Sequence, residues 1–334
     1  MNHPMQFLEL IRGFMSSRIL LTAVELDLFT QIDRGVDTAK ALAKNNDLDL
    51  RALTRLLDAV VSFNFLQKEN QRYTLSPDAE WLSGDHPDTP LPMALHMNDL
   101  WNAWTHLTET IRKGHNPELV PVAEKEEQSL NAFIGAMHVV GKDLAREIAD
   151  DLDLSSYQRL LDIGGASGTY TLAFLNKNPD MTAVIFDLAP VLPIAEKRLS
   201  ASAMADRVKL VGGDFYKDQL PAGFDLVLLS AIIHQNSPDQ NMVLFQKIYN
   251  AMLPGGTLII RDHIMDDHRT SPPAGTVFAI NMLVATEGGD TYTFEEVEQW
   301  LATAGFSEIR QFRHGEKMDG IVSRQKKQLK INEI

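Results

Sequence analysis

Apolar positions in the N-terminal part of the chain recur every three or four places, the spacing of amphipathic helices. This pattern covers residues 19–29 and returns over residues 42–61, with polar residues in the gaps. The apolar runs then shorten to residues 65–68 and 73–75, which flank a polar turn over residues 69–71. We expect several short helices followed by a two-stranded wing, the arrangement of a winged helix.

From residue 158 onward the pattern changes, because short and almost continuous apolar runs alternate with helical stretches. The runs lie at residues 160–163, 183–186, 208–211, 226–229 and 257–260. Such runs are typical of parallel strands that helices cover on both faces. They predict an α/β fold with a Rossmann-like, doubly wound sheet, preceded by the α-helical winged-helix domain. In such a sheet a ligand binds at the carboxyl ends of the strands.

The chain of 334 residues is long enough for more than one domain. We place the winged helix at residues 1–83, a helical connector with Trp101 and Trp104 at residues 84–150, and the sheet domain at residues 151–325. A net charge of -14 disfavours nucleic acid as a partner, and no apolar run approaches the 18 to 20 residues that span a membrane. The start lacks the pattern of a signal peptide, so we expect a cytoplasmic protein without membrane contact.

The absence of cysteine removes several kinds of chemistry from consideration. Disulfides, thiolate catalysis, iron–sulfur clusters and cysteine-based zinc sites all require that residue. Any catalysis must use other side chains.

A glycine-rich segment, residues 164–168, follows the first predicted strand. Glycines allow a ligand to approach the backbone closely, although each can also serve a simple turn. The dinucleotide pattern needs glycine two places after Gly164, where Ala166 stands, so a nicotinamide site is weakly supported.

Acids follow the next two strands. Asp187 lies 23 positions after Gly164 and could accept both hydroxyl protons of a ribose. Asp214 could accept from an adenine amino group while Phe215 packs on the ring. Either acid could instead cap a helix. Three consecutive strand ends that each offer a suitable group favour a nucleoside site.

His234 follows the fourth strand and Asp262 ends the fifth, so both should face the same crevice. A histidine titrates near neutral pH and suits proton abstraction. Asp262 could accept from the other ring nitrogen and orient the imidazole. A structural histidine and a capping acid are the alternatives.

Segments 160–168, 186–188, 213–215 and 232–234 occur in the order found in class I S-adenosylmethionine-dependent methyltransferases. Together with the N-terminal half, the chain resembles the caffeic-acid-type, small-molecule O-methyltransferase family over residues 10–325. The resemblance implies S-adenosylmethionine as cofactor, a small aromatic acceptor, and a homodimer formed through the winged-helix domain. It assigns His234 as the base that takes the proton of a phenolic hydroxyl, whose pKa is about 10, and Asp262 as its orienting acid. Because the sulfonium methyl group is already activated, we expect no metal. It places the cofactor against Gly164, Asp187, Leu188, Asp214, Phe215 and Ser230, and the acceptor against Phe133, Met137, Phe278, Asn281 and Met282.

The chain departs from the family pattern in three segments, at four positions. Ser230 stands where the family often has lysine, Gln235-Asn236 replace an Asp-Trp pair, and Thr291 replaces a second acid that only Asp290 and Glu287 could supply. These changes leave open a relative that binds the cofactor for decarboxylation, hydroxylation or cyclisation.

A DNA-binding regulator is the alternative from another class. The candidate recognition helix, residues 50–64, carries only Arg51 and Arg55 against Asp58. Two arginines predict weak, salt-sensitive binding to phosphates.

Overall fold

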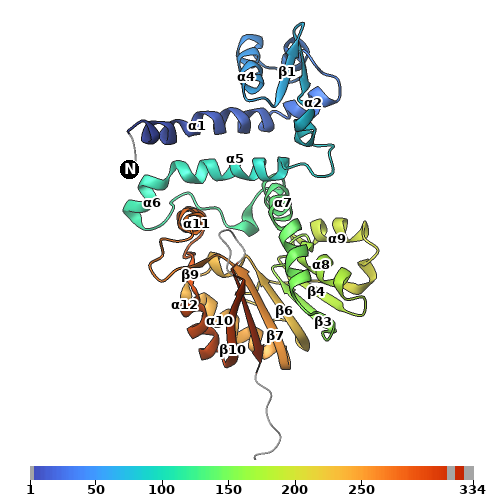
Figure 1. Cartoon of the computed structure of the whole chain (residues 1–334), viewed down its shortest axis with the longest axis vertical. Helices are drawn as coiled ribbons and strands as arrows, with labels where there is room; N and C mark the ends of the chain where they lie inside the picture. The colour runs from blue at the N-terminus through green and yellow to red at the C-terminus, as the bar shows by residue number, and fades with distance from the viewer. Residues whose placement is uncertain (1–3, 314–319, 327–334) are drawn as a thin grey trace, which may run out of the picture. The chain divides into compact units, whose positions relative to one another are not determined.

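The computed structural model describes residues 4–313 and 320–326 (Figure 1). The chain divides into two compact units. The first comprises Met1–Trp101 and Asn131–Val139, and the second comprises Asn102–Leu130 and Val140–Ile334. The domain boundaries at residues 83 and 150 remain predictions.

The first unit contains the expected helices and wing. Its elements are α1 (Pro4–Glu25), α2 (Leu28–Asp33), α3 (Ala39–Asn45), α4 (Leu50–Ser62), the hairpin β1 (Leu66–Glu69) and β2 (Arg72–Leu75), the short 3-10 helix η1 (Pro77–Leu82), and most of α5 (Leu91–Thr105). Thr38 and Asp49 cap α3 and α4, because each side chain accepts the backbone N–H three residues on. The apolar faces meet in a core around Phe29, Leu57 and Tyr73.

The second unit begins with α6 (Leu107–Lys113), η2 (Val122–Glu124) and α7 (Glu127–Asp151), of which residues 131–139 belong to the first unit. It continues through β3 (Arg159–Ile163), α8 (Thr169–Lys177), β4 (Thr182–Asp187), α9 (Leu192–Ser200), η3 (Ala205–Arg207), β5 (Val208–Gly212), β6 (Phe224–Ser230), η4 (Ile233–Gln235), α10 (Pro238–Ala251) and β7 (Met252–Asp262). It ends with β8 (Ile264–Met265), α11 (Pro273–Ala285), β9 (Tyr292–Thr293), α12 (Phe294–Thr303), β10 (Phe306–Arg313) and β11 (Gly320–Lys326).

The main sheet has the order β10-β11-β7-β6-β3-β4-β5. Five of its strands are parallel, and β11 and β10 extend it in antiparallel fashion. The chain reverses its direction of winding between β3 and β6, as in a doubly wound fold, where ligands bind outside the carboxyl ends of the strands at such a reversal. The fold class predicted from the sequence is therefore confirmed, although β10 and β11 were not predicted.

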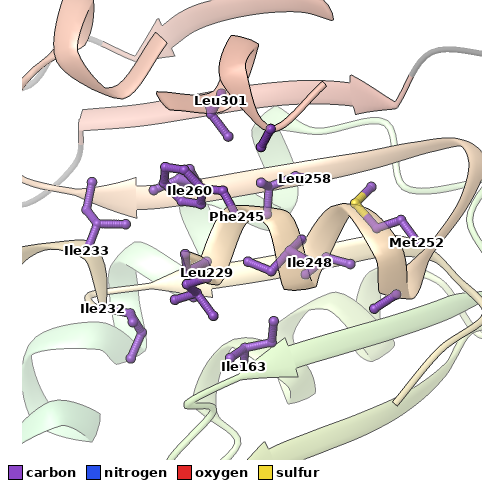
Figure 2. Close-up of a cluster of buried hydrophobic side chains, with 14 of the residues drawn as sticks. Ile163, Leu229, Ile232, Ile233, Phe245, Ile248, Met252, Leu258, Ile260 and Leu301 are labelled. Atoms are coloured by element: carbon purple, nitrogen blue, oxygen red, sulfur yellow. The ribbon is translucent and has the colours of Figure 1, made fainter. Parts of the chain in front are cut away.

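Alternate residues of the strands face two different cores. Leu229 and Ile260 point toward Phe245 and Ile248 of α10, as Figure 2 shows. Leu228 and Ile259 face the other way, where α7 and α8 cover the sheet. Burying each such side chain contributes about 1.5–3 kcal/mol, so both faces hold the strand ends in place. Within the described part of the chain, no helix combines the length and apolar character needed to cross a membrane.

Candidate active site

The glycine-rich turn between β3 and α8 depends on glycine at Gly164. Its backbone has φ +67°, and its N–H donates to the Phe186 carbonyl at 2.8 Å. An added Cβ would lie 2.5 Å from Ile232 Cδ1 and 4.0 Å from Phe215 Cε1. A side chain would therefore force a shift of the turn or of Ile232, and the positive φ also favours glycine at this position.

Asp187, at the end of β4, is bound to both neighbouring loops. Its Oδ2 accepts the Ala166 N–H at 2.8 Å and its Oδ1 accepts the Leu188 N–H at 2.7 Å. Burial raises the pKa of Asp187, while these two hydrogen bonds oppose the rise. A carboxylate offers about four acceptor positions, so two remain for ribose hydroxyls.

Asp214 and Phe215 follow β5 on a loop that hydrogen bonds and an ion pair hold in place. Asp214 Oδ1 accepts the Tyr216 N–H at 2.9 Å, and its Oδ2 lies 3.1 Å from Lys217 Nζ. Lys247 Nζ donates to the Phe215 carbonyl at 2.8 Å. Phe215 also packs on Tyr216, with ring centres 4.5 Å apart. Together with Asp187, this acceptor and ring match an adenosine in chemistry.

Ser230 ends β6 and is level with Arg261 of β7 in the parallel register. Both lie near Tyr170 of α8. Burial raises the pKa of Tyr170, and the positive charge of Arg261 and the hydroxyl of Ser230 act against the rise. Position 230 therefore lacks the lysine that the family often has, but Arg261 supplies a cation on the adjacent strand β7.

His234 and Asp262 form a buried pair. The distance from His234 Nδ1 to Asp262 Oδ1 is 2.7 Å, with the imidazole 11% and the carboxylate 0% exposed. Burial favours the protonated acid, but the charge and hydrogen bond of His234 and the neighbouring His263 hold the pKa of Asp262 below its usual value. Because Nδ1 faces the carboxylate, Nε2 is left to take a proton.

Helix α11 places one of the predicted acceptor residues, Phe278, beside this pair. Phe278 packs edge-on against His234, with ring centres 4.8 Å apart and an interplanar angle of 89°. One turn later, Asn281 Oδ1 accepts the Trp104 Nε1–H at 2.9 Å. Met282 is buried, with 6% of its surface exposed.

Phe133 and Met137 lie on the part of α7 that belongs to the first unit. There the Phe133 ring packs on His96, with centres 5.2 Å apart. Their place in an acceptor pocket therefore remains a prediction.

Sequence reasoning missed a network of amides beneath the His234 loop. Asn236 is 0% exposed; its Nδ2 donates to Asn241 Oδ1 at 2.9 Å, and its Oδ1 accepts the Tyr216 hydroxyl at 2.5 Å. Asn241 Nδ2 donates to the Ile233 carbonyl at 2.9 Å, and the Tyr292 hydroxyl donates to the Asn236 carbonyl. The residue that replaces the family's tryptophan thus holds the loop that carries His234.

Thr291 occupies the position of the family's second acid and has no carboxylate. Its hydroxyl lies 3.5 Å from the Gly275 carbonyl, while the neighbouring Asp290 carboxylate pairs with Arg269 at 2.9 Å. The Asp290 N–H donates to the His234 carbonyl at 2.9 Å. This segment therefore contacts the backbone of the histidine loop rather than its ring nitrogens.

The turn at Gly289 packs directly on the same loop. A Cβ at Gly289 would lie 2.3 Å from the His234 carbonyl oxygen, so only glycine fits there. A cavity of about 260 Å³ opens beside this turn, lined in part by Arg269, Leu283 and Glu287. Across the described ranges, no cluster of three or more histidine, aspartate or glutamate side chains is placed to hold a metal ion.

Comparison with known proteins shows that two family models match this chain. The O-methyltransferase domain matches residues 104–307, and the O-methyltransferase dimerisation domain matches residues 8–85. The tetracenomycin polyketide synthesis 8-O-methyl transferase TcmO of Streptomyces glaucescens is 30% identical over 320 residues, which cover 92% of each chain.

Two further relatives extend over nearly the whole chain. The acetylserotonin O-methyltransferase of Gallus gallus is 27% identical over 343 residues and covers 97% of this chain and 98% of its own. The solved structure of human N-acetylserotonin methyltransferase in complex with SAM has a TM-score of 0.84 at 24% identity, over 98% of this chain and 99% of that one.

Proposed function

The chain belongs to the family of S-adenosylmethionine-dependent O-methyltransferases, and from that premise we propose that it methylates a hydroxyl on the ring of a small aromatic metabolite. The observation that carries this proposal is the His234–Asp262 pair. It lies at the ends of β6 and β7, beside strand ends whose acids and aromatic ring match an adenosine.

S-adenosylmethionine, when bound, supplies a methyl group that its sulfonium has already activated. His234 Nε2 removes the proton of the acceptor hydroxyl during attack, which typically contributes about 10²- to 10⁴-fold. Asp262 keeps the imidazole in the required tautomer and stabilises it once protonated, since the low pKa of Asp262 leaves the carboxylate ionised. Alignment of the acceptor oxygen with the methyl group supplies the larger part, on the order of 7–11 kcal/mol.

An aromatic acceptor is supported by the Phe278 ring beside His234. A flat ring can stack or pack edge-on against phenylalanine more favourably than an aliphatic chain does. The names of the relatives agree, since one from Streptomyces sahachiroi methylates the 3-oxygen of a hydroxynaphthoate and is 29% identical over 317 residues.

Mass spectrometry with methyl-labelled S-adenosylmethionine tests this function. The panel contains a hydroxynaphthoate, N-acetylserotonin and a polyketide phenol, each paired with a control whose hydroxyl is already capped as a methyl ether. We expect labelled product and S-adenosylhomocysteine from at least one free phenol and from none of the capped controls. Cofactor binding without S-adenosylhomocysteine, together with a decarboxylated, hydroxylated or cyclised product from a cell extract, would replace the proposal by a non-methylating reaction.

The homodimer is proposed from the N-terminal helix. The match to a dimerisation domain covers residues 8–85, and α1 exposes the large apolar side chains of Met5, Phe7, Leu10, Ile11, Phe14 and Met15. An exposed apolar stripe of this kind marks a protein interface. Light scattering should give twice the chain mass of 37.3 kDa. The double variant Leu10→Glu/Phe14→Glu should be a monomer, and Val243→Glu, at an exposed valine of α10, should leave the dimer intact.

A further inference from the structure

A buried arginine at the end of β7 has no partner for its charge among residues 4–313 and 320–326. Arg261 is 3% exposed, and its Nε is buried without a hydrogen-bond partner. A guanidinium group stays protonated in proteins, and burial of an unpaired charge is costly. The Arg261 guanidinium is therefore suited to bind an anionic group of a ligand.

The surroundings of Arg261 are polar, but no carboxylate of the described ranges forms an ion pair with it. Its Cζ lies 5.7 Å from the centre of the Tyr170 ring, and the Tyr170 hydroxyl is also buried, beside the hydroxyl of Ser230. The acid on the same side of the sheet, Asp162, accepts the Thr171 hydroxyl at 2.6 Å. Burial raises the pKa of Asp162 to about 7, which weakens it further as a counter-ion.

The alternation of side chains separates Arg261 from the catalytic pair. Successive residues of a strand point to opposite faces, so Arg261 shares the α8 face with Ile259, while Asp262 shares the α10 face with Ile260. The cation thus faces the helix that follows the glycine-rich turn. It does not face the Phe278 side, where the acceptor would lie.

A sulfonium carries three substituents, and the site offers three matching positions. Asp187 on β4 suits the ribose, and His234 after β6 marks the direction of the methyl group. The remaining substituent is the amino-acid chain, which would lie beside Arg261, Tyr170 and Ser230. We propose that Arg261 binds the carboxylate of the amino-acid part of S-adenosylmethionine, an inference that rests on the proposed function.

Calorimetry with two ligands tests this assignment without any acceptor. S-adenosylhomocysteine carries the amino-acid carboxylate, whereas 5′-methylthioadenosine shares the adenosine and thioether and lacks it. In Arg261→Met the affinity for S-adenosylhomocysteine should fall about 10- to 100-fold, the range expected for a charge-assisted hydrogen bond. The affinity for 5′-methylthioadenosine should stay within about twofold, because that ligand has no group for the guanidinium to hold.

Three further variants separate charge, position and folding. Arg159→Met removes an arginine that lies 5.1 Å over the Phe224 ring at the opposite end of the sheet, so it makes the same change of charge and should leave both affinities unchanged. Arg261→Lys keeps the charge and should lose less S-adenosylhomocysteine affinity than Arg261→Met. Ser230→Lys in the Arg261→Met background restores a cation at the adjacent register position and should recover part of the loss.

Two results would overturn the inference. Equal losses for both ligands would assign Arg261 a structural role, and an unchanged S-adenosylhomocysteine affinity would show that the carboxylate binds elsewhere. If Arg261→Met does not fold, the same comparison is made with Arg261→Lys, whose affinity must then fall for S-adenosylhomocysteine alone. A wild-type protein that binds neither ligand would instead refute the proposed function itself.

Discussion

The two halves of the strand-end crevice are built by different means. Around β4, the Asp187 carboxylate accepts two backbone N–H groups, from Ala166 and Leu188. Around β6 and β7, side chains bond to one another, as His234 does with Asp262 and Asn236 with Asn241. A backbone N–H donor is kept when its residue is substituted by any residue except proline. In a network of side chains, one substitution removes the partner of another side chain, so the members must change together.

This difference matches where the chain departs from its family. Ser230, the Gln235-Asn236 pair and Thr291 all lie in the β6 and β7 half or in segments packed on it. Glycine and acids in the other half keep the expected pattern. We infer that the half built on the main chain keeps the nucleoside of the cofactor. The half built on side chains adapts to the acceptor on the α10 face of the sheet and, under our inference for Arg261, to the cofactor's carboxylate on the α8 face.

The largest expected effect comes from His234→Asn, which tests the acceptor half alone. Removing the base should lower kcat by about 10²- to 10⁴-fold. The affinity for S-adenosylhomocysteine, measured by calorimetry, should stay unchanged because no cofactor residue moves. A kcat within tenfold of wild type would mean that another group takes the proton.

Gly164→Ala should break the cofactor half instead. The added Cβ would lie 2.5 Å from Ile232 at a backbone φ of +67°, so the turn must shift and S-adenosylhomocysteine affinity should fall at least about tenfold. Gly35→Ala is the matched control, since its φ is +90° and no atom lies within 4 Å of the added Cβ. That control should lose stability from the same backbone strain but bind the ligand normally. Equal affinities in the two variants would rule out a special role for the turn.

Asp162 lies under the glycine-rich turn and predicts a pH dependence of stability. Its pKa is raised to about 7 in the folded state, against about 3.9 in the unfolded chain. Between these values the unfolded state has released a proton that the folded state keeps. The free energy of unfolding should therefore fall as pH rises, by about 1.4 kcal/mol per pH unit from this group.

Urea unfolding between pH 5 and pH 8 checks the sign with Asp162→Asn. The variant has no proton to lose, so its stability should rise relative to wild type as pH increases. Asp206→Asn, at an exposed acid of η3, serves as the control for net charge and should run parallel to wild type. Parallel curves for all three proteins would show that burial does not shift this carboxyl.

How much the sequence predicts depends on the range of the contacts involved. The five parallel strands were predicted because each is a local apolar run. Strand β10 was missed at the antiparallel edge, because all its residues after Phe306 are half-buried or exposed and form no apolar run. Asp187 and Asp214 could be predicted because each lies at or just after the end of an apolar run. The contact between Asn236 and Tyr216 spans 20 positions, and no spacing rule encodes it.

The smallest expected effect concerns the longest of these contacts. Trp104 Nε1–H donates to Asn281 Oδ1 across 177 positions and so fixes the orientation of an amide that we predict to contact the acceptor. Trp104→Phe removes one neutral hydrogen bond worth about 0.5–1.5 kcal/mol, which should raise the KM for the acceptor by about two- to tenfold. The values of kcat and of S-adenosylhomocysteine affinity should not change, because neither His234 nor the cofactor half is touched. A matching loss of cofactor affinity would instead couple the two halves of the crevice, and the contrast between them would then fail.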